Sequence, residues 1–480
     1  MSIKKNFLHN ILYILSNLLF PIISFSYSSR IIGPEGIGKV QFVITFAQYF
    51  VMVAALGIPA YGIREVAKAR GDRNKLSKLF SELLVINIIS SAVLLFAYLI
   101  IIFSVNWFYP DMTFYILSGV IVLSGFSVID WFFIGMEQFH YLSIRSIVIK
   151  AVAIIALLLF VKSPHDLLVY FLITIFSLLG NNIWNLTNLK GQISFQLKKL
   201  ELIKHLPVLF ILFSTAITIS IYTMVDTLFL GFLTDDRAVG FYTAAIRLTK
   251  IAIPLATSLG TVLIPGITQS IVSKDHGLLQ KLTNQSFSFI CLLAVPISFG
   301  LLLYAPEIIT VFSGTKFIEA VPTMQIATPL VFFIGLGAIF GQQLLIPSGN
   351  ERGYFVATIL GMVTSVVLYL CLIPLFKDRG AAMATVVGEF MVSATAYYFV
   401  NRKMDLHFNW LLALKALLVS LLFIPIAFVL RGCIANVVVR LVSEIVCCAG
   451  GYFAIQLFVF KEKQLRMVYN DVGKKYFGKF

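Results

Sequence analysis

The sequence predicts an all-α polytopic membrane protein with about fourteen transmembrane helices, arranged as two six-helix lobes plus two extra C-terminal helices. The chain has 480 residues, of which 59% are hydrophobic and only 12% are charged, and its mean hydropathy is +0.94. A soluble protein of this size would carry about 25% charged residues. The apolar residues recur in runs of about 20, the length that crosses a bilayer as a helix. No loop between these runs is long enough to fold as a separate soluble domain.

The apolar runs define the predicted spans one by one. In order they cover residues 7–29, 39–61, 80–104, 113–135, 144–162, 166–188, 206–232, 238–264, 283–304, 323–346, 353–375, 380–401, 409–430 and 436–460. Inside the bilayer, every polar backbone group must be satisfied within a helix or against a water-filled cavity.

Glycine and proline motifs suggest an internal repeat. Glycines at 33–38 follow span 1 and "LGIP" closes span 2, while glycines at 231–240 follow span 7 and "LGTVLIP" closes span 8. A repeat offset by six spans keeps its orientation, so the halves would be parallel. We therefore predict an N-lobe of spans 1–6 (residues 1–205), a C-lobe of spans 7–12 (206–404), and spans 13 and 14 with a basic cytoplasmic tail (405–480).

The net charge of +15 reflects membrane topology rather than a nucleic-acid partner. Roughly two thirds of the 37 Lys and Arg residues fall in the two tails and the even-numbered loops, which lie on one side of the membrane. The positive-inside rule then orients both termini to the cytoplasm. We expect the lipid bilayer as a partner and no nucleic acid.

The stretch from Gly33 to Lys39, "GPEGIGK", resembles the phosphate-binding loop of nucleotide hydrolases. Such a loop needs a preceding strand, a soluble sheet and Ser or Thr after the lysine. Here Val40 stands in that place, both flanks are membrane spans, and the predicted topology puts the loop outside the cytoplasm. An ATPase is therefore excluded, and we expect a tight outer turn between spans 1 and 2.

The sequence predicts neither a cofactor nor a metal site, and no catalytic residue. Its six histidines are scattered at span ends without the spacing of metal ligands. The lack of a large outer loop lowers the case for a membrane glycosyltransferase or polymerase without excluding it.

Charges inside the spans are the remaining candidates, because an intramembrane charge is costly and by default functional. Arg247 and Lys250 lie three residues apart, near the middle of the span predicted at 238–264. Either internal carboxylates, such as Asp226 in span 7 or Glu389 in span 12, offset these cations, or an anionic ligand does. Arg30 lies at the outer end of span 1. Three further charges lie close enough to an interface for their side chains to snorkel: Lys150, Lys415 and Glu82.

Four motifs resemble a known family. They are "SRIIGPEGIGKVQF", "ALGIPAYGIREVAK", "VDTLFLGFLTDDRAVGFYTAAIRLTK" and the pair "QQLLIPSGNERGY" and "LIPLFKDRGAAMATVVGEF". In this order they are similar to the bacterial oligosaccharide flippases, the Wzx-type polysaccharide biosynthesis proteins of the MATE-like exporter superfamily. Lys377 departs from the family, which often has glycine before its "GAA" run.

The resemblance implies a substrate and a mechanism. The substrate would be an oligosaccharide linked to undecaprenyl diphosphate, flipped from the cytoplasmic to the outer leaflet by alternating access without ATP. With this substrate we expect Arg64 to meet the diphosphate at the cytoplasmic mouth, and Arg247, Lys250 and Arg30 to hold it, because arginine and lysine side chains suit phosphate oxygens.

The same resemblance implies a setting. The protein would lie in the bacterial cytoplasmic (inner) membrane, with polysaccharide polymerase and glycosyltransferases as candidate partners. Apart from the resemblance, we expect one of the two embedded carboxylates, Asp226 or Glu389, to couple the cycle to protons or sodium. An ion-coupled exporter of small amphiphiles, of the multidrug type, is the alternative, and a membrane glycosyltransferase or polymerase is the third.

Overall fold

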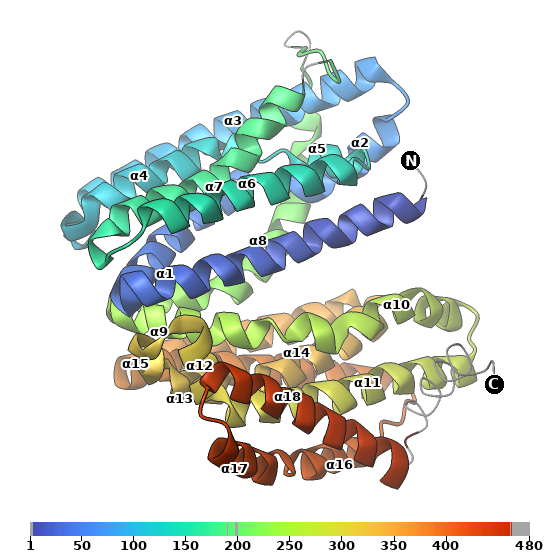
Figure 1. The fold of residues 1–480 in the computed structure, drawn as a ribbon. Helices are drawn as coiled ribbons and strands as arrows, with labels where there is room; N and C mark the ends of the chain where they lie inside the picture. Colours follow the sequence, from blue (N-terminus) through green and yellow to red (C-terminus); the bar gives the residue numbers. More distant parts are fainter. Residues whose placement is uncertain (1–2, 190, 197–199, 461, 463–480) are drawn as a thin grey trace. The chain divides into compact units, whose positions relative to one another are not determined.

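The computed structural model describes residues 3–189, 191–196, 200–460 and 462. Within these residues the regular structure is helical and contains no β-strand, which confirms the all-α class (Figure 1). In the same residues, eleven helical segments are long and apolar enough to cross a membrane, with shorter apolar helices beside them. The count of fourteen stays a prediction, and the basic tail at 463–480 lies outside the described residues.

The contacts within the chain divide it into two units, Met1–Gly240 and Phe241–Phe480. The boundary between lobes that the sequence suggests at residue 205 stays a prediction. The helices of the first unit are α1 (Ile3–Ala54), α2 (Ile58–Ala69), α3 (Arg73–Ser104), α4 (Met112–Leu123), α5 (Asp130–Gly135), α6 (Phe139–Phe160), α7 (Leu167–Asn188) and α8 (Leu206–Leu233). Helix α9 (Asp236–Lys250) begins in this unit and ends in the next.

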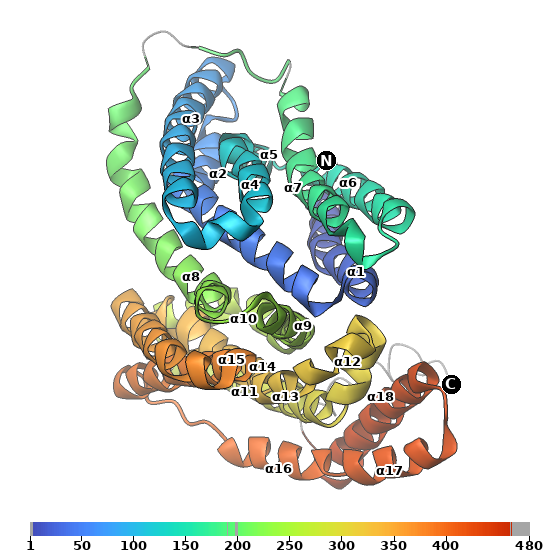
Figure 2. The same cartoon turned by 90° about the vertical axis from the view of Figure 1, so that its left-hand side faces the viewer.

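In the first unit, α1 packs along α6, and α3, α4 and α7 pack side by side (Figures 1 and 2). The tight turn predicted between spans 1 and 2 is a break at a single residue. Helix α1 runs through it and leaves helical geometry only at Gly33, whose φ of 83° favours glycine. Pro34 then opens the second half of the helix, where its missing N–H costs nothing.

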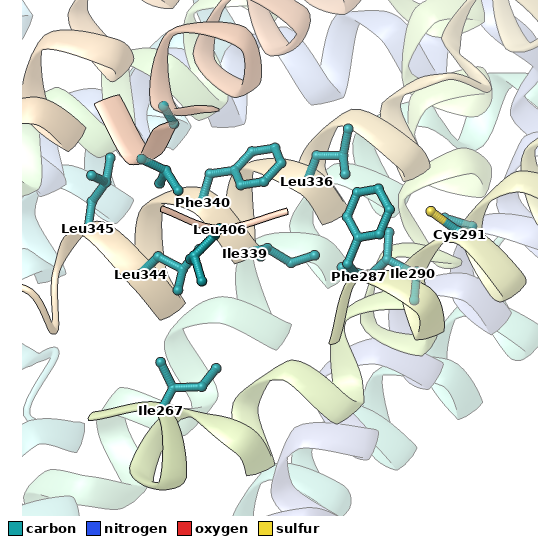
Figure 3. Close-up of a cluster of buried hydrophobic side chains, with 14 of the residues drawn as sticks. Ile267, Phe287, Ile290, Cys291, Leu336, Ile339, Phe340, Leu344, Leu345 and Leu406 are labelled. Atoms are coloured by element: carbon teal, nitrogen blue, oxygen red, sulfur yellow. The ribbon is translucent and has the colours of Figure 1, made fainter. Parts of the chain in front are cut away.

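The helices of the second unit are α10 (Ile253–Val272), α11 (His276–Leu303), α12 (Ala305–Ser313), α13 (Val321–Ala327), α14 (Leu330–Gly337), α15 (Glu351–Lys403), α16 (Trp410–Ser420), α17 (Phe423–Cys433) and α18 (Val437–Ala454). A π-helix, Ala338–Leu345, continues α14. Its apolar side chains, together with Phe287 and Ile290 of α11, form the core in Figure 3. Helix α15 joins the two spans predicted at 353–375 and 380–401, and it is broken at Lys377 (φ 51°, ψ −126°).

Candidate functional site

The break in α1 lies where this helix meets the first turn of α9. A Cβ atom at Gly38 would lie 1.7 Å from the carbonyl oxygen of Asp236. Likewise, a Cβ atom at Gly240 would lie 2.0 Å from the carbonyl oxygen of Pro34. Two glycines, one on each helix, therefore allow backbone to pass backbone. The glycines of the "GPEGIGK" stretch serve helix packing.

Lys39 completes this contact with charge. Its Nζ lies 2.8 Å from Oδ1 of Asp111 and 3.6 Å from Oδ2 of Asp236. The lysine of the apparent phosphate loop thus forms ion pairs with two carboxylates of its own chain. These ion pairs link α1 to the 3₁₀-helix Asn106–Asp111 and to α9.

Arg247 and Lys250 lie in the last turn of α9, both half-buried. The sequence suggests one continuous span over 238–264, but the helix is interrupted at residues 251 and 252. Pro254 explains the break, because it has no N–H to donate to the carbonyl of Lys250. The two cations therefore lie at the carboxyl end of a helix, where the helix dipole favours positive charge.

Arg30 and Arg64 belong to the first unit, and both side chains are exposed. Arg30 lies on α1 just before the break at Gly33. On α2, the guanidinium of Arg64 donates to Oε1 of Glu65 at 2.8 Å and lies 5.3 Å from the ring centre of Tyr61. Partial burial would raise the pKa of Glu65, but hydrogen bonds from Lys68 and Arg64 lower it.

Of the two predicted coupling carboxylates, Asp226 is buried in α8 and Glu389 is half-buried in α15. Oδ1 of Asp226 accepts the backbone N–H of Thr227 at 2.6 Å and its hydroxyl at 3.2 Å. Asp226 belongs to the first unit and Glu389 to the second. Among the predicted site residues, Arg247 and Lys250 lie on the same helix, α9.

Sequence reasoning missed a buried polar network in the first unit. The guanidinium of Arg145, on α6, is 2% exposed and donates to both carboxylate oxygens of Asp130, at 2.9 and 3.1 Å. Asn185 of α7 and Tyr13 of α1 also donate to this carboxylate, at 2.6 and 3.1 Å. The signal was an arginine just inside the span predicted at 144–162, which should have been counted with the other embedded charges.

A second network replaces the snorkelling expected of Glu82. This side chain is 1% exposed, and its Oε2 lies 2.8 Å from Nε2 of His205, which directly precedes α8. Nδ1 of the same histidine lies 2.8 Å from the hydroxyl of Tyr61. Lys204 and Lys78 are 3.4 and 3.8 Å from the carboxylate. The start of α8 is thereby tied to α2 and α3.

The all-helical fold, with many helices able to cross a membrane and charged groups buried among them, defines a multi-pass membrane protein. Residues 3–271 match the family described as polysaccharide biosynthesis protein, and residues 212–371 match the MatE family. Because the first match covers more than half of the chain, the chain belongs to the polysaccharide biosynthesis protein family.

The relatives are transporters and flippases rather than enzymes. A candidate O-antigen transporter of Escherichia coli (strain K12) is 25% identical over 411 residues, which cover 84% of this chain and 97% of that protein. The lipid II flippase MurJ of Bacillus subtilis (strain 168) is 27% identical over 174 residues, covering 35% of this chain and 31% of MurJ.

Solved structures share the fold. The lipid II flippase MurJ in an inward closed conformation matches with a TM-score of 0.73 at 16% identity, over 95% of this chain and 99% of that one. An inward-facing multidrug resistance MATE family transporter matches with a TM-score of 0.63 at 13% identity, over 82% and 98%.

Proposed function

We propose that this protein flips oligosaccharides linked to undecaprenyl diphosphate from the cytoplasmic to the outer leaflet, for the assembly of a surface polysaccharide. The observation that carries the proposal is a half-buried Arg247 and Lys250 within a membrane helix of a polysaccharide biosynthesis protein. The relatives, a candidate O-antigen transporter and a lipid II flippase, support the same class of cargo.

In the proposed cycle, cations handle the diphosphate while the polyprenyl tail stays in the lipid. Arg64, exposed on α2, meets the head group first. Arg247, Lys250 and Arg30 then hold it, because arginine matches phosphate oxygens with paired N–H groups and lysine adds a point charge. The two lobes rock to open outward, as in other transporters built from repeats.

The proposal also covers energy and setting. Asp226 or Glu389 binds the proton or sodium ion that drives the cycle. The protein lies in the bacterial inner membrane with both termini in the cytoplasm, and it works beside glycosyltransferases and a polymerase.

Complementation tests the cationic site. In a strain that lacks this transporter, Arg247→Ala combined with Lys250→Ala should lower surface polysaccharide at least about tenfold, because two charge-assisted contacts are lost. The matched control is Arg402→Ala with Lys403→Ala, an exposed pair in the last turn of α15. Full glycan display by the first double variant, at normal expression, would remove the basis of the proposal.

A second candidate function is the ion-coupled export of small amphiphiles, and the match of residues 212–371 to the MatE family supports it. Cationic drugs need acidic sites, and the cations of α9 argue against them. Drug resistance on overexpression would favour the exporter, whereas untranslocated lipid-linked intermediates in a deletion strain would favour the flippase over a synthetic enzyme.

A further inference from the structure

Helices α1 and α6 of the first unit meet along a line of polar side chains. At one end Tyr13 reaches Asp130, and next to it the hydroxyls of Ser16 and Ser146 lie 3.3 Å apart. At the other end, Nζ of Lys150 donates to the side-chain oxygen of Asn17. Lys150 is therefore directed towards α1 instead of snorkelling as expected. Asn17 is exposed and Lys150 is half-buried, so this end of the line is partly exposed.

The carboxylate near this line has no capacity left for Lys150. A carboxylate offers about four acceptor positions. Oδ1 of Asp130 accepts from Arg145 and Asn185, and Oδ2 accepts from Arg145 and Tyr13. Arg145 binds both oxygens of this carboxylate, and its single positive charge neutralises the single negative charge of Asp130.

Among the charged side chains of this line, the positive charges outnumber the negative charges by one. Asp130 contributes one negative charge, while Arg145 and Lys150 contribute two positive charges. In the described part of the chain, no carboxylate lies within ion-pair distance of Lys150, whose hydrogen-bond partner is the neutral amide of Asn17. An ammonium inside a membrane helix without a counter-ion is costly, and the nearby Arg145 makes it more so.

The hydrogen-bond donors at the exposed end of the line, where Lys150 meets Asn17, suit an anion. The Lys150 ammonium has three N–H groups, and the amide oxygen of Asn17 takes one of them. The amide nitrogen of Asn17 carries two N–H groups. One of them hydrogen-bonds the Tyr13 hydroxyl, and the second is a further donor beside the ammonium. We propose that Lys150 and Asn17 form a second anion-binding point, which takes a phosphate oxygen or a sugar carboxylate of the cargo during transport.

This inference rests on the proposed function, because the anion is taken to be part of the cargo. Binding to the purified full chain in lipid nanodiscs tests it, with undecaprenyl diphosphate, inorganic pyrophosphate and glucuronate as separate probes. The variants are Lys150→Met, which keeps the shape and removes the charge, and Lys150→Arg, which keeps the charge. Lys415→Met is the matched control, since Lys415 is another intramembrane lysine, 5.6 Å from the ring centre of Phe460.

We expect Lys150→Met to weaken an anionic probe about tenfold or more, Lys150→Arg to retain most of the binding, and Lys415→Met to leave it unchanged. Weaker binding of undecaprenyl diphosphate and pyrophosphate identifies the phosphate as the ligand, whereas weaker binding of glucuronate alone identifies a sugar carboxylate. Without ligand, Lys150→Met should melt no lower than the parent, because it removes an uncompensated charge. A lower melting temperature would mark Lys150 as a structural residue and overturn the inference.

The two proposals fail in different ways. Unchanged binding in Lys150→Met, together with loss in the Arg247→Ala, Lys250→Ala variant, overturns the site at Lys150 and leaves the flippase proposal standing. A parent protein that binds none of the three probes overturns both.

Discussion

Gly240→Ala tests the close contact between α1 and α9. The added methyl group would lie 2.0 Å from the carbonyl oxygen of Pro34 and 2.7 Å from its carbonyl carbon. Carbon and oxygen atoms in close contact are normally about 3.3 Å apart. The two helices would therefore have to move apart by more than about 1 Å, or the break at Gly33 would have to distort.

The expected cost follows from what the methyl group meets. Forcing a methylene-sized group into a packed site costs about 1–3 kcal/mol, and the upper end applies because the obstacle is backbone rather than a side-chain tip. Alanine in place of glycine inside a helix returns about 0.5–1 kcal/mol. We therefore expect Gly240→Ala to lower the free energy of unfolding by about 2 kcal/mol.

Denaturant unfolding of the protein in detergent measures this difference. Gly450→Ala is the matched control, because Gly450 lies inside α18 and, apart from its chain neighbours and the nearby backbone of its own helix, no described atom lies within 4 Å of the place that an added methyl group would take. That variant should gain up to about 1 kcal/mol through helix propensity alone. Equal unfolding midpoints for the two variants would refute the close contact at Gly240.

Three further outcomes are expected. His205→Ala removes a hydrogen bond from the buried carboxylate of Glu82 and should lower the free energy of unfolding by about 2 kcal/mol. The control Lys68→Ala removes an ion pair at the surface and should lower it by under about 1 kcal/mol. Equal losses in unfolding experiments would contradict the buried network. Lys377→Gly should add about 1 kcal/mol, since glycine tolerates φ 51°, and a loss would mean that the lysine side chain is needed there. Hydrogen bonds from Lys204 and Lys78 lower the pKa of Glu201 from 4.5 to about 2, so the parent's stability advantage over Glu201→Gln should be complete above pH 4.5 and vanish as the pH falls towards 2, as unfolding curves across this range would show.

The sequence predicted the ends of some helices because the bilayer itself imposes the apolar pattern. The spans predicted at 80–104 and 166–188 end at the same residues as α3 and α7. Helix starts outside the apolar run were missed. Helix α3 begins at Arg73, where the side chain of Asp72 accepts the N–H groups of Asn74 and Lys75. Hydropathy cannot report such a cap, which depends on the geometry of the chain rather than on the membrane.

The sequence could not predict which residues pair with the embedded charges. Glu82 and His205 are 123 residues apart, and a carboxylate near a span end looks the same in sequence whether it snorkels or binds a buried histidine. Arg145 and Asp130 are only 15 residues apart, yet their contact depends on how α6 packs beside α5. Hydropathy gives the depth of a charge in the membrane, whereas its counter-charge is a property of the tertiary fold.

The counter-charge also decides which cations are available to cargo. Lys39 and Arg145 each face carboxylates of their own chain, so an added anion would compete with a full negative charge. Lys250 lies at a helix end, which supplies roughly half a charge. Lys150 faces a neutral amide. An anion gains most affinity beside a cation that has the least negative charge of the protein next to it, so the proposed cargo contacts should be strongest at Lys150 and Lys250. Lys39 and Arg145 hold helices together instead.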